Sequence, residues 1–211
     1  GTSDTLAITI LPVPQTSAIQ GVQQLCIYDT SAFSVTNSVG STYQWIATNG
    51  TVATGQGTNT TTVFWNASGN QNLAVIETNS YGCVGDTINY TPLINPLPNA
   101  NAGSDVAICI GKDVQLNASG GTVYNWNPSV GLSNPNISNP LSNPTSTTTY
   151  TVLVTDTNGC KKADSVLVTV NPLPIVTCFP SSPAICIATS TTLNATGGLI
   201  YQWSPNYALD D

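Results

Sequence analysis

The sequence lacks several residue types on which most catalytic and nucleic-acid-binding sites depend. Among its 211 residues there is no His, no Arg and no Met. Without His, no imidazole can serve as a general base or a metal ligand, so a nucleophilic triad of the usual kind is excluded. Three lysines are too few to neutralise a phosphate backbone, and nucleic-acid binding is therefore excluded as well. We expect no enzymatic activity and no cofactor.

Charged residues are scarce in general. They make up 6% of the chain, with 10 acidic residues against 3 lysines and a formal net charge of −7, whereas a soluble domain usually has about 25%. Surface polarity must come from uncharged groups, which 31 Thr, 20 Ser and 22 Asn supply. Apolar runs are only a few residues long, so no membrane-spanning segment is predicted. The sequence shows no basic-then-apolar leader, and we interpret it as a mature segment.

Six cysteines are present, an even number in a chain without His. A zinc site would need close C-x-x-C pairs, and the two nearest cysteines are Cys178 and Cys186. Disulfides in an oxidising, extracellular setting are the better interpretation.

The chain repeats itself, with three landmarks in a fixed order. A Cys between two aliphatic residues is followed by a Tyr-x-Trp, then by a Gly-Cys, and finally by an apolar stretch that runs into Pro-x-Pro. The matching cysteines are Cys26, Cys109 and Cys186; the aromatic pairs are Tyr43 with Trp45, Tyr124 with Trp126 and Tyr201 with Trp203; the Gly-Cys cysteines are Cys83 and Cys160. This order predicts two complete units, 12–95 and 96–171. Residues 1–11 match the last strand of a preceding repeat, and 172–211 match the first half of a further one.

Within a unit the pattern is that of β-strands. Residues 149–155 and 165–170 are rich in β-branched side chains, and Asp156-Thr157-Asn158-Gly159 between them contains the Asn-Gly pair typical of a hairpin turn. Residues 114–118 alternate in the same way. Long runs with a 3.6-residue period are missing, and Gly and Pro are frequent. The prediction is an all-β protein made of tandem immunoglobulin-like antiparallel β-sandwiches, with a Trp on the third strand of each.

The repeated Trp45, Trp126 and Trp203 allow two interpretations. Exposed aromatic side chains can stack on sugars, but a Trp at one fixed strand position in each small sandwich is usually the centre of the core, and we expect core packing. Trp65 occurs only in the first unit; it is the better ligand-contact candidate, although packing is again favoured.

The cysteines are expected to pair within units, Cys26 with Cys83 and Cys109 with Cys160, because both intervals close a unit. Cys178 has no counterpart in the earlier units; it pairs either with Cys186 or with a cysteine outside this sequence, and we slightly favour the local pair. The Pro-x-Pro junctions are stiff, so we expect the units to form a rod. Asp156 and Asn158 offer oxygens to Ca²⁺, yet an ordinary hairpin turn explains them better.

From Asp105 to Val170 the sequence resembles a known class of repeats. The run 104–111, the alternation at 114–121, Tyr124-x-Trp126, Thr148–Val152 and Asp156-x-Asn158-Gly159-Cys160 are similar to the PKD-like and immunoglobulin-like tandem repeats of very large Bacteroidota cell-surface proteins. The unit 12–95 is similar to a sister repeat of the same proteins, although the W-D-F-G-D-G signature of PKD domains proper is absent. The resemblance implies type IX secretion and a role in adhesins, in filaments associated with gliding motility, or in spacers of secreted enzymes.

Three functions remain open on the sequence. The leading one is a non-catalytic stalk or adhesin filament at the cell surface, whose partners are neighbouring repeats of the same chain and surface glycans or other cell-surface proteins. The alternatives are an array of carbohydrate-binding modules and the spacer domains of a secreted enzyme. The resemblance also implies a glycoprotein: each unit has Asp, a hydroxyl residue and an aliphatic residue in turn, the O-glycosylation pattern of Bacteroidota, which makes Thr5, Thr87 and Ser165 candidate acceptors. A local turn contact of the Asp and hydroxyl groups explains the same pattern.

Overall fold

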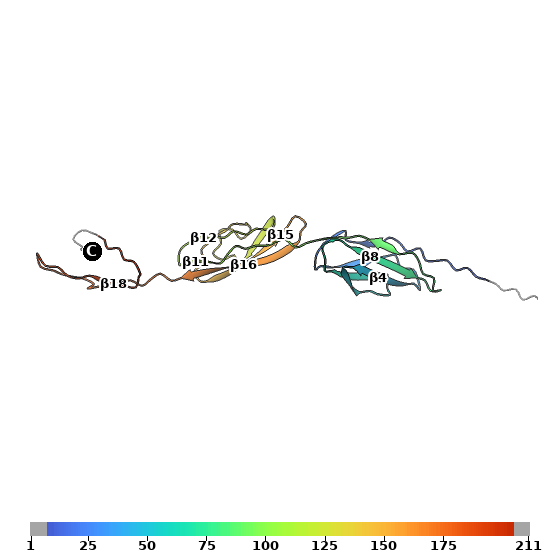
Figure 1. Cartoon of the computed structure of the whole chain (residues 1–211), viewed down its shortest axis with the longest axis horizontal. Coiled ribbons are helices and arrows are strands. Elements are labelled where there is room, and N and C mark those ends of the chain that lie inside the picture. The colour runs from blue at the N-terminus through green and yellow to red at the C-terminus, as the bar shows by residue number, and fades with distance from the viewer. Residues whose placement is uncertain (1–7, 205–211) are drawn as a thin grey trace, which may run out of the picture.

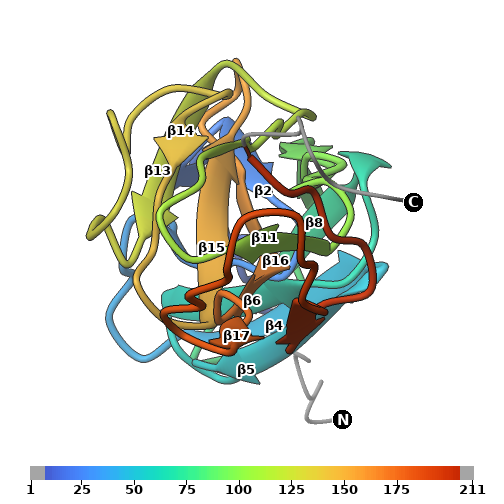
Figure 2. The same cartoon turned by 90° about the vertical axis from the view of Figure 1, so that its left-hand side faces the viewer.

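The computed structural model of the chain describes residues 8–204. Every regular element in this range is a β-strand, and none of its segments is a helix long and apolar enough to cross a membrane. Two sandwiches and a smaller pair of strands follow one another along the longest axis of the molecule (Figure 1). Figure 2 shows the same molecule end on, with the sandwiches overlapping in projection.

The first sandwich contains ten strands in three sheets. One sheet has the order β1-β3-β6-β5, a second the order β4-β8-β9, and a third the order β2-β10-β7. All pairs are antiparallel except β2 with β10, which is parallel. The bounds are β1 Gln20–Gly21, β2 Gln24–Cys26, β3 Thr30–Ser34, β4 Thr42–Thr48, β5 Gly50–Thr54, β6 Thr60–Trp65, β7 Gly69–Asn70, β8 Asn72–Thr78, β9 Ile88–Tyr90 and β10 Leu93–Asn95.

Strand alternation builds the first core. In β4 the side chains alternate between exposed and buried, so that Tyr43 and Trp45 both point inward. Trp45 lies opposite Val75 of β8, and Phe33 meets the edge of the Trp65 ring at 6.3 Å between centroids. The buried apolar side chains of this core are Ile19, Phe33, Val35, Tyr43, Trp45, Val63, Trp65, Leu73, Val75 and Ile94.

The second sandwich is smaller. A four-stranded sheet of order β11-β16-β15-β13 faces the two-stranded sheet β12-β14. Its first and last strands, β11 and β16, pair in parallel, as β2 and β10 do in the first sandwich. The bounds are β11 Val106–Cys109, β12 Val114–Gln115, β13 Val123–Asn127, β14 Leu141–Ser142, β15 Thr148–Thr155 and β16 Lys161–Asn171. Its core consists of Ala102, Leu116, Trp126, Tyr150, Val152, Val154, Val166 and Val168.

The predicted hairpin is present: β15 and β16 pair antiparallel from Thr148 with Val168 to Thr155 with Lys161. The segment predicted as a strand at 114–118 is regular only over Val114–Gln115. Beyond it, the amide of Leu116 donates to the carbonyl of Pro140 at 3.0 Å. Proline has no N–H, so Pro140 cannot donate the second hydrogen bond of this pair, and the regular ladder is interrupted.

The remaining described segments are less regular. Residues 8–11, predicted to belong to a last strand, lie in no strand. After the second sandwich, β17 Thr177–Phe179 pairs with β18 Asn194–Thr196. Beside this pair Val176, Ala195 and Trp203 line a hollow of about 200 Å³.

Candidate functional site: the junction between the two sandwiches

One side of the junction is the turn that follows β2. The last residue of β2, Cys26, lies beside Asn95 at the end of β10. The amide of Asp29 donates to the carbonyl of Cys26 at 3.1 Å, and a carboxylate oxygen of Asp29 accepts from the Cys26 amide at 3.2 Å. Tyr28, at φ 73°, provides the left-handed residue of the turn. The sulfur of Cys26 is thereby held at the end of the first sandwich from which the chain leaves.

The other side is the turn between β15 and β16. A single carboxylate oxygen of Asp156 accepts from the amides of Asn158 and Cys160, both at 2.9 Å. The amide of Asp156 in turn donates to the carbonyl of Cys160 at 3.0 Å, and Gly159 has φ 83°. Asp156 therefore organises the turn that presents Cys160.

A disulfide joins these two turns. Cys26 and Cys160 are bonded, with a Cα–Cα distance of 5.6 Å and a separation of 134 positions in sequence. The bond connects two different sandwiches, and Cys160 is buried. The predicted pairing of Cys26 with Cys83 and of Cys109 with Cys160 is therefore wrong.

For the second unit the reason is the length of its last strand, β16. Cys109 is in register with Asn171 at the end of β16, while Cys160 directly precedes Lys161 at its start. A strand of this length spans about 35 Å at 3.3 Å per residue, and a disulfide tolerates Cα atoms only about 4 to 7 Å apart. The two cysteines of one unit thus lie at opposite ends of the sandwich.

The other four cysteines, all within the described range, are free thiols: Cys83 is half-buried, and Cys109, Cys178 and Cys186 are exposed. The favoured pair of Cys178 with Cys186 is therefore not formed in this structure. Cys178 instead lies in β17, opposite Ala195.

The polypeptide linker crosses the junction beside the disulfide. Asn95 is buried; its side-chain amide donates to the carbonyl of Leu25 at 3.2 Å, and its own carbonyl accepts from Ile27 at 2.8 Å. Pro98 is buried and Leu97 half-buried. The sandwiches thus have two covalent connections, a proline-containing linker and a disulfide, which together restrict bending more than either would alone.

The aromatic residues of interest lie mainly in the cores. Trp45 and Trp126 are 1% and 2% exposed, and their indole N–H groups donate to the carbonyls of Thr58 and Ile137, both at 2.9 Å. Trp65 is completely buried. None of these three is open to a ligand; Trp203 is half-buried beside the hollow next to β18.

The candidate glycosylation residues have different surroundings. Thr87 is exposed in the segment before β9. Ser165 is exposed but shares a hydrogen bond of 2.8 Å with the hydroxyl of Thr151, and the neighbouring Asp164 accepts from the amide of Ala102 at 2.7 Å. Ala102 and Asp164 are 62 positions apart in sequence, so this bond is not the local turn contact proposed as the alternative for this Asp. Thr5 lies outside the described residues.

Sequence reasoning missed the role of Glu77, the only Glu of the chain. Its side chain is 1% exposed and accepts a hydrogen bond of 2.9 Å from Thr16. Burial alone would raise the pKa of Glu77, but hydrogen bonds from Ser41, Ser38, Thr16 and Tyr43 outweigh it and hold the pKa below its ordinary value. The carboxylate thereby fastens the segment before β1 onto β8.

Within residues 8–204, no three His, Cys, Asp or Glu side chains gather in a way that could hold a metal ion. Asp156, considered as a Ca²⁺ ligand, has one carboxylate oxygen occupied by the two amides of its turn. Besides the linker, the Cys26–Cys160 bond is the covalent connection between the two sandwiches, and the junction that it closes is the candidate site.

No protein-family model and no curated protein matches this chain. Among solved structures, it is similar to DIP-gamma IG1+IG2, with 12% identity, 73% of this chain and 98% of that chain covered, and a TM-score of 0.32. The fibronectin(III)-like modules of Clostridium thermocellum CbhA are 11% identical over 73% of this chain and 94% of that chain, with a TM-score of 0.32. Extracellular domains 3–5 of Drosophila OTK are 14% identical, with 72% and 62% covered and a TM-score of 0.33. The names of these proteins carry nothing over to this chain.

Proposed function

We propose that the chain is a non-catalytic structural segment of a long extracellular surface protein, in which linked sandwiches form a stalk or adhesin filament. The observation that carries the proposal is the double connection at the junction, where Cys26–Cys160 and the linker 96–98 tie one sandwich to the next. A repeat protein that transmits force or holds a distant module away from a surface needs stiff junctions, and two covalent ties provide them.

The composition supports an extracellular location. Disulfides persist in oxidising compartments and are uncommon in the cytosol. The many Thr, Ser and Asn side chains hydrate the surface although charges are few. The solubility of the chain should therefore depend only weakly on salt. The resemblance to Bacteroidota surface repeats adds the expectation of type IX secretion, and sugars at Thr87 and Ser165 would shield the neighbouring strands from pairing with other chains.

The carbohydrate-binding alternative has no specific observation in its favour. The repeated Trp45 and Trp126, which would have to stack on sugar rings, are in the cores. The enzyme-spacer alternative describes the same stiff segment and differs only in what the array carries.

Small-angle X-ray scattering of the chain tests the proposed stiffness. A compact globule of 211 residues would have a radius of gyration of about 17 Å. We expect a clearly larger value, because two sandwiches in line have centres about 30 to 45 Å apart. A compact value would refute the stalk, and a broad distribution that is unchanged by reduction of the disulfide would refute the role of the junction in stiffness.

A further inference from the structure

The turn that presents Cys26 occurs again at Cys109. The amide of Lys112 donates to the carbonyl of Cys109 at 3.0 Å, as Asp29 does to Cys26 at 3.1 Å. The residue two positions after the cysteine is left-handed in both turns, Gly111 at φ 80° and Tyr28 at φ 73°. The turn cysteine of the second sandwich is thus held as that of the first is held.

Both turn cysteines also have the same place in their sheets. Cys109 is in register with Asn171 in a parallel pair, as Cys26 is with Asn95. The backbone amide of the residue after the cysteine donates to the carbonyl of that Asn: Ile110 to Asn171 at 2.9 Å, and Ile27 to Asn95 at 2.8 Å. Cys109 therefore lies where the chain leaves the second sandwich.

The hairpin that presents Cys160 likewise occurs again at Cys83. Asn79 takes the place of Asp156, and its side-chain oxygen accepts from the amides of Tyr81 and Cys83 at 3.0 and 2.9 Å. The backbone amide of Asn79 donates to the carbonyl of Cys83 at 3.0 Å, the same distance as in the bridged hairpin. The two hairpins are copies of one structure.

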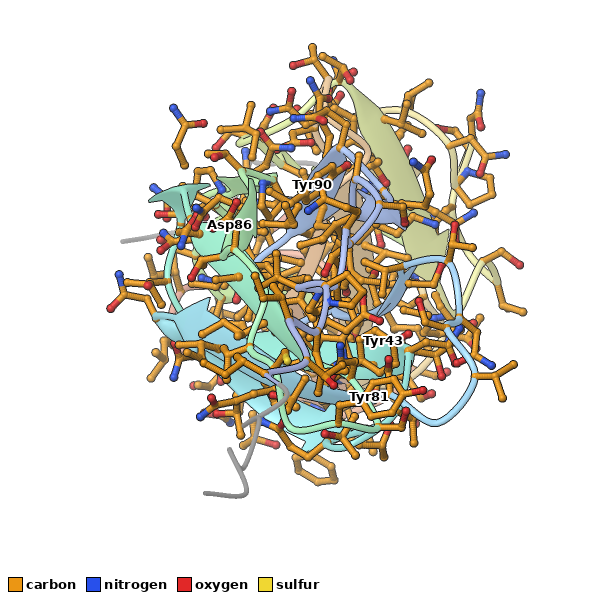
Figure 3. The ribbon with its side chains drawn as sticks, turned by 90° about the vertical axis from the view of Figure 1, so that its right-hand side faces the viewer. Tyr43, Tyr81, Asp86 and Tyr90 are labelled. Atoms are coloured by element: carbon orange, nitrogen blue, oxygen red, sulfur yellow. A yellow bond between two sulfur atoms is a disulfide. The ribbon has the colours of Figure 1, made fainter. Side chains whose placement is uncertain are left out.

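Cys83 lies where the chain enters the first sandwich. The side-chain amide of Asn79 donates to the carbonyl of Pro12 in the Pro-x-Pro segment at 2.9 Å. Figure 3 looks onto the end of the first sandwich that faces away from the second, and labels Tyr81 and Asp86, which flank Cys83 in sequence. Cys83 and Cys109 are thus at the two outer ends of the pair of sandwiches.

The surface around Cys109 has the same residues as the junction around Cys26, but here, within the described range, no neighbouring sandwich covers them. Ile110 and Leu173 are 43% and 59% exposed, whereas their counterparts Ile27 and Leu97 are half-buried. Pro174 is exposed, whereas its counterpart Pro98 is buried. Residues 172–211 contain no Gly-Cys hairpin that could cover this surface.

We infer that each junction of the array is closed by the same disulfide, which links a turn cysteine to the hairpin cysteine of the next repeat. The partner of Cys109 is the hairpin cysteine of a complete repeat that directly follows 96–171, and the partner of Cys83 is the turn cysteine of a repeat that directly precedes 12–95. This inference rests on the proposed repeat role and extends it to a continuous covalent ladder. Cys186, whose carbonyl accepts from Thr189 at 3.1 Å, belongs to the same series.

The bond forms by oxidation of two thiols. Each Sγ loses its proton, the two sulfurs share a new bond, and the two electrons released reduce the disulfide of an oxidant to two thiols. The oxidant is of the disulfide class, either a small molecule such as oxidised glutathione or a protein disulfide donor.

The test starts from the 211-residue chain with a second copy of residues 96–171 inserted after Asn171. The insertion reproduces the native Asn-Pro-Leu-Pro junction, since Asn95 and Asn171 precede identical Pro-Leu-Pro sequences. Both proteins are refolded with oxidised and reduced glutathione, alkylated without reduction and mapped by mass spectrometry. The parent chain should retain its four free thiols.

We expect the inserted chain also to have four free thiols, although the insertion adds two cysteines. Peptide mapping should find Cys109 of the first copy bonded to Cys160 of the inserted copy, together with the original Cys26–Cys160 bond. In the matched control Cys109→Ser, the Cys160 thiol of the inserted copy should become free. An alkylated Cys109 beside an intact Cys26–Cys160 bond would overturn the inference.

A second variant tests Cys83, at the other end of the pair of sandwiches, and keeps the inference testable if the first variant misfolds. In it, a copy of 96–171 precedes Pro12, and the copied Cys109 should bond to Cys83. If Cys83 stays free here while Cys26–Cys160 forms, or if Cys26–Cys160 is absent from the parent chain, the inference is wrong. Scattering separates it from the proposed function, because an elongated chain with a free Cys109 would refute only the ladder, and a bridged but compact chain only the stalk.

Discussion

Replacing Cys26 by Ser should uncouple the two sandwiches. When the first sandwich unfolds alone, the second still holds both Pro96 and Cys160 in place. The intact bond therefore ties an unfolded segment of about 70 residues at both ends, which the chain-entropy model values at about 4 kcal/mol. The same argument gives a similar value for separate unfolding of the second sandwich. We expect Cys26→Ser to lower the free energy of unfolding of each sandwich by up to this amount.

Urea unfolding followed by Trp fluorescence measures the effect, since Trp45 and Trp65 report on the first core and Trp126 on the second. With a slope of about 1 to 1.5 kcal/mol per M for sandwiches of this size, the midpoint should fall by about 3 M. A second, separate transition should appear if the two cores differ in stability.

The matched control is Cys109→Ser. Cys109 occupies the same kind of turn, is exposed and has no bond, so its substitution should change the free energy of unfolding by no more than about 0.5 kcal/mol. Equal midpoints for Cys26→Ser and Cys109→Ser would refute the coupling, as would an unchanged midpoint of the parent chain after reduction.

Three further predictions concern single residues. Trp126→Ala should destabilise the second sandwich by about 3 to 5 kcal/mol in urea unfolding, because a fully buried indole and its hydrogen bond are lost. The pKa of Glu77 is lowered in the folded chain, so its carboxylate stabilises the fold fully above the ordinary value of 4.5, and this stabilisation is lost as the pH falls through the lower folded value. Glu77→Gln should therefore flatten the acid limb of a plot of unfolding free energy against pH. An unaltered limb would contradict this. Intact mass of the natively expressed protein should exceed that of the bare chain by hexose-sized additions that map to Thr87 and Ser165, and a bare mass would remove the glycosylation hypothesis.

The local structure was predictable from sequence because short-range chemistry decides it. Alternating valines and an Asn-Gly turn specify the β15–β16 hairpin, and the structure has it at 148–171. The shortness of β12 was harder to predict, because it depends on Pro140 lying opposite this strand, and the sequence does not show which segments face each other. The same holds for Glu77, whose hydroxyl partners come from two separate segments, Thr16 and the stretch 38–43.

The cysteine pairing failed for a geometric reason that sequence spacing hides. In a tandem array, one turn cysteine and one hairpin cysteine per repeat allow pairing within a repeat or across a junction, and both fit the same period. The choice depends on which end of the sandwich each turn occupies. In the second sandwich β16 shows this directly: it begins after the hairpin cysteine, ends beside the turn cysteine, and runs into the proline linker. The turn cysteine must therefore lie at the exit of its own repeat and the hairpin cysteine at the entrance, so that only cysteines of consecutive repeats meet.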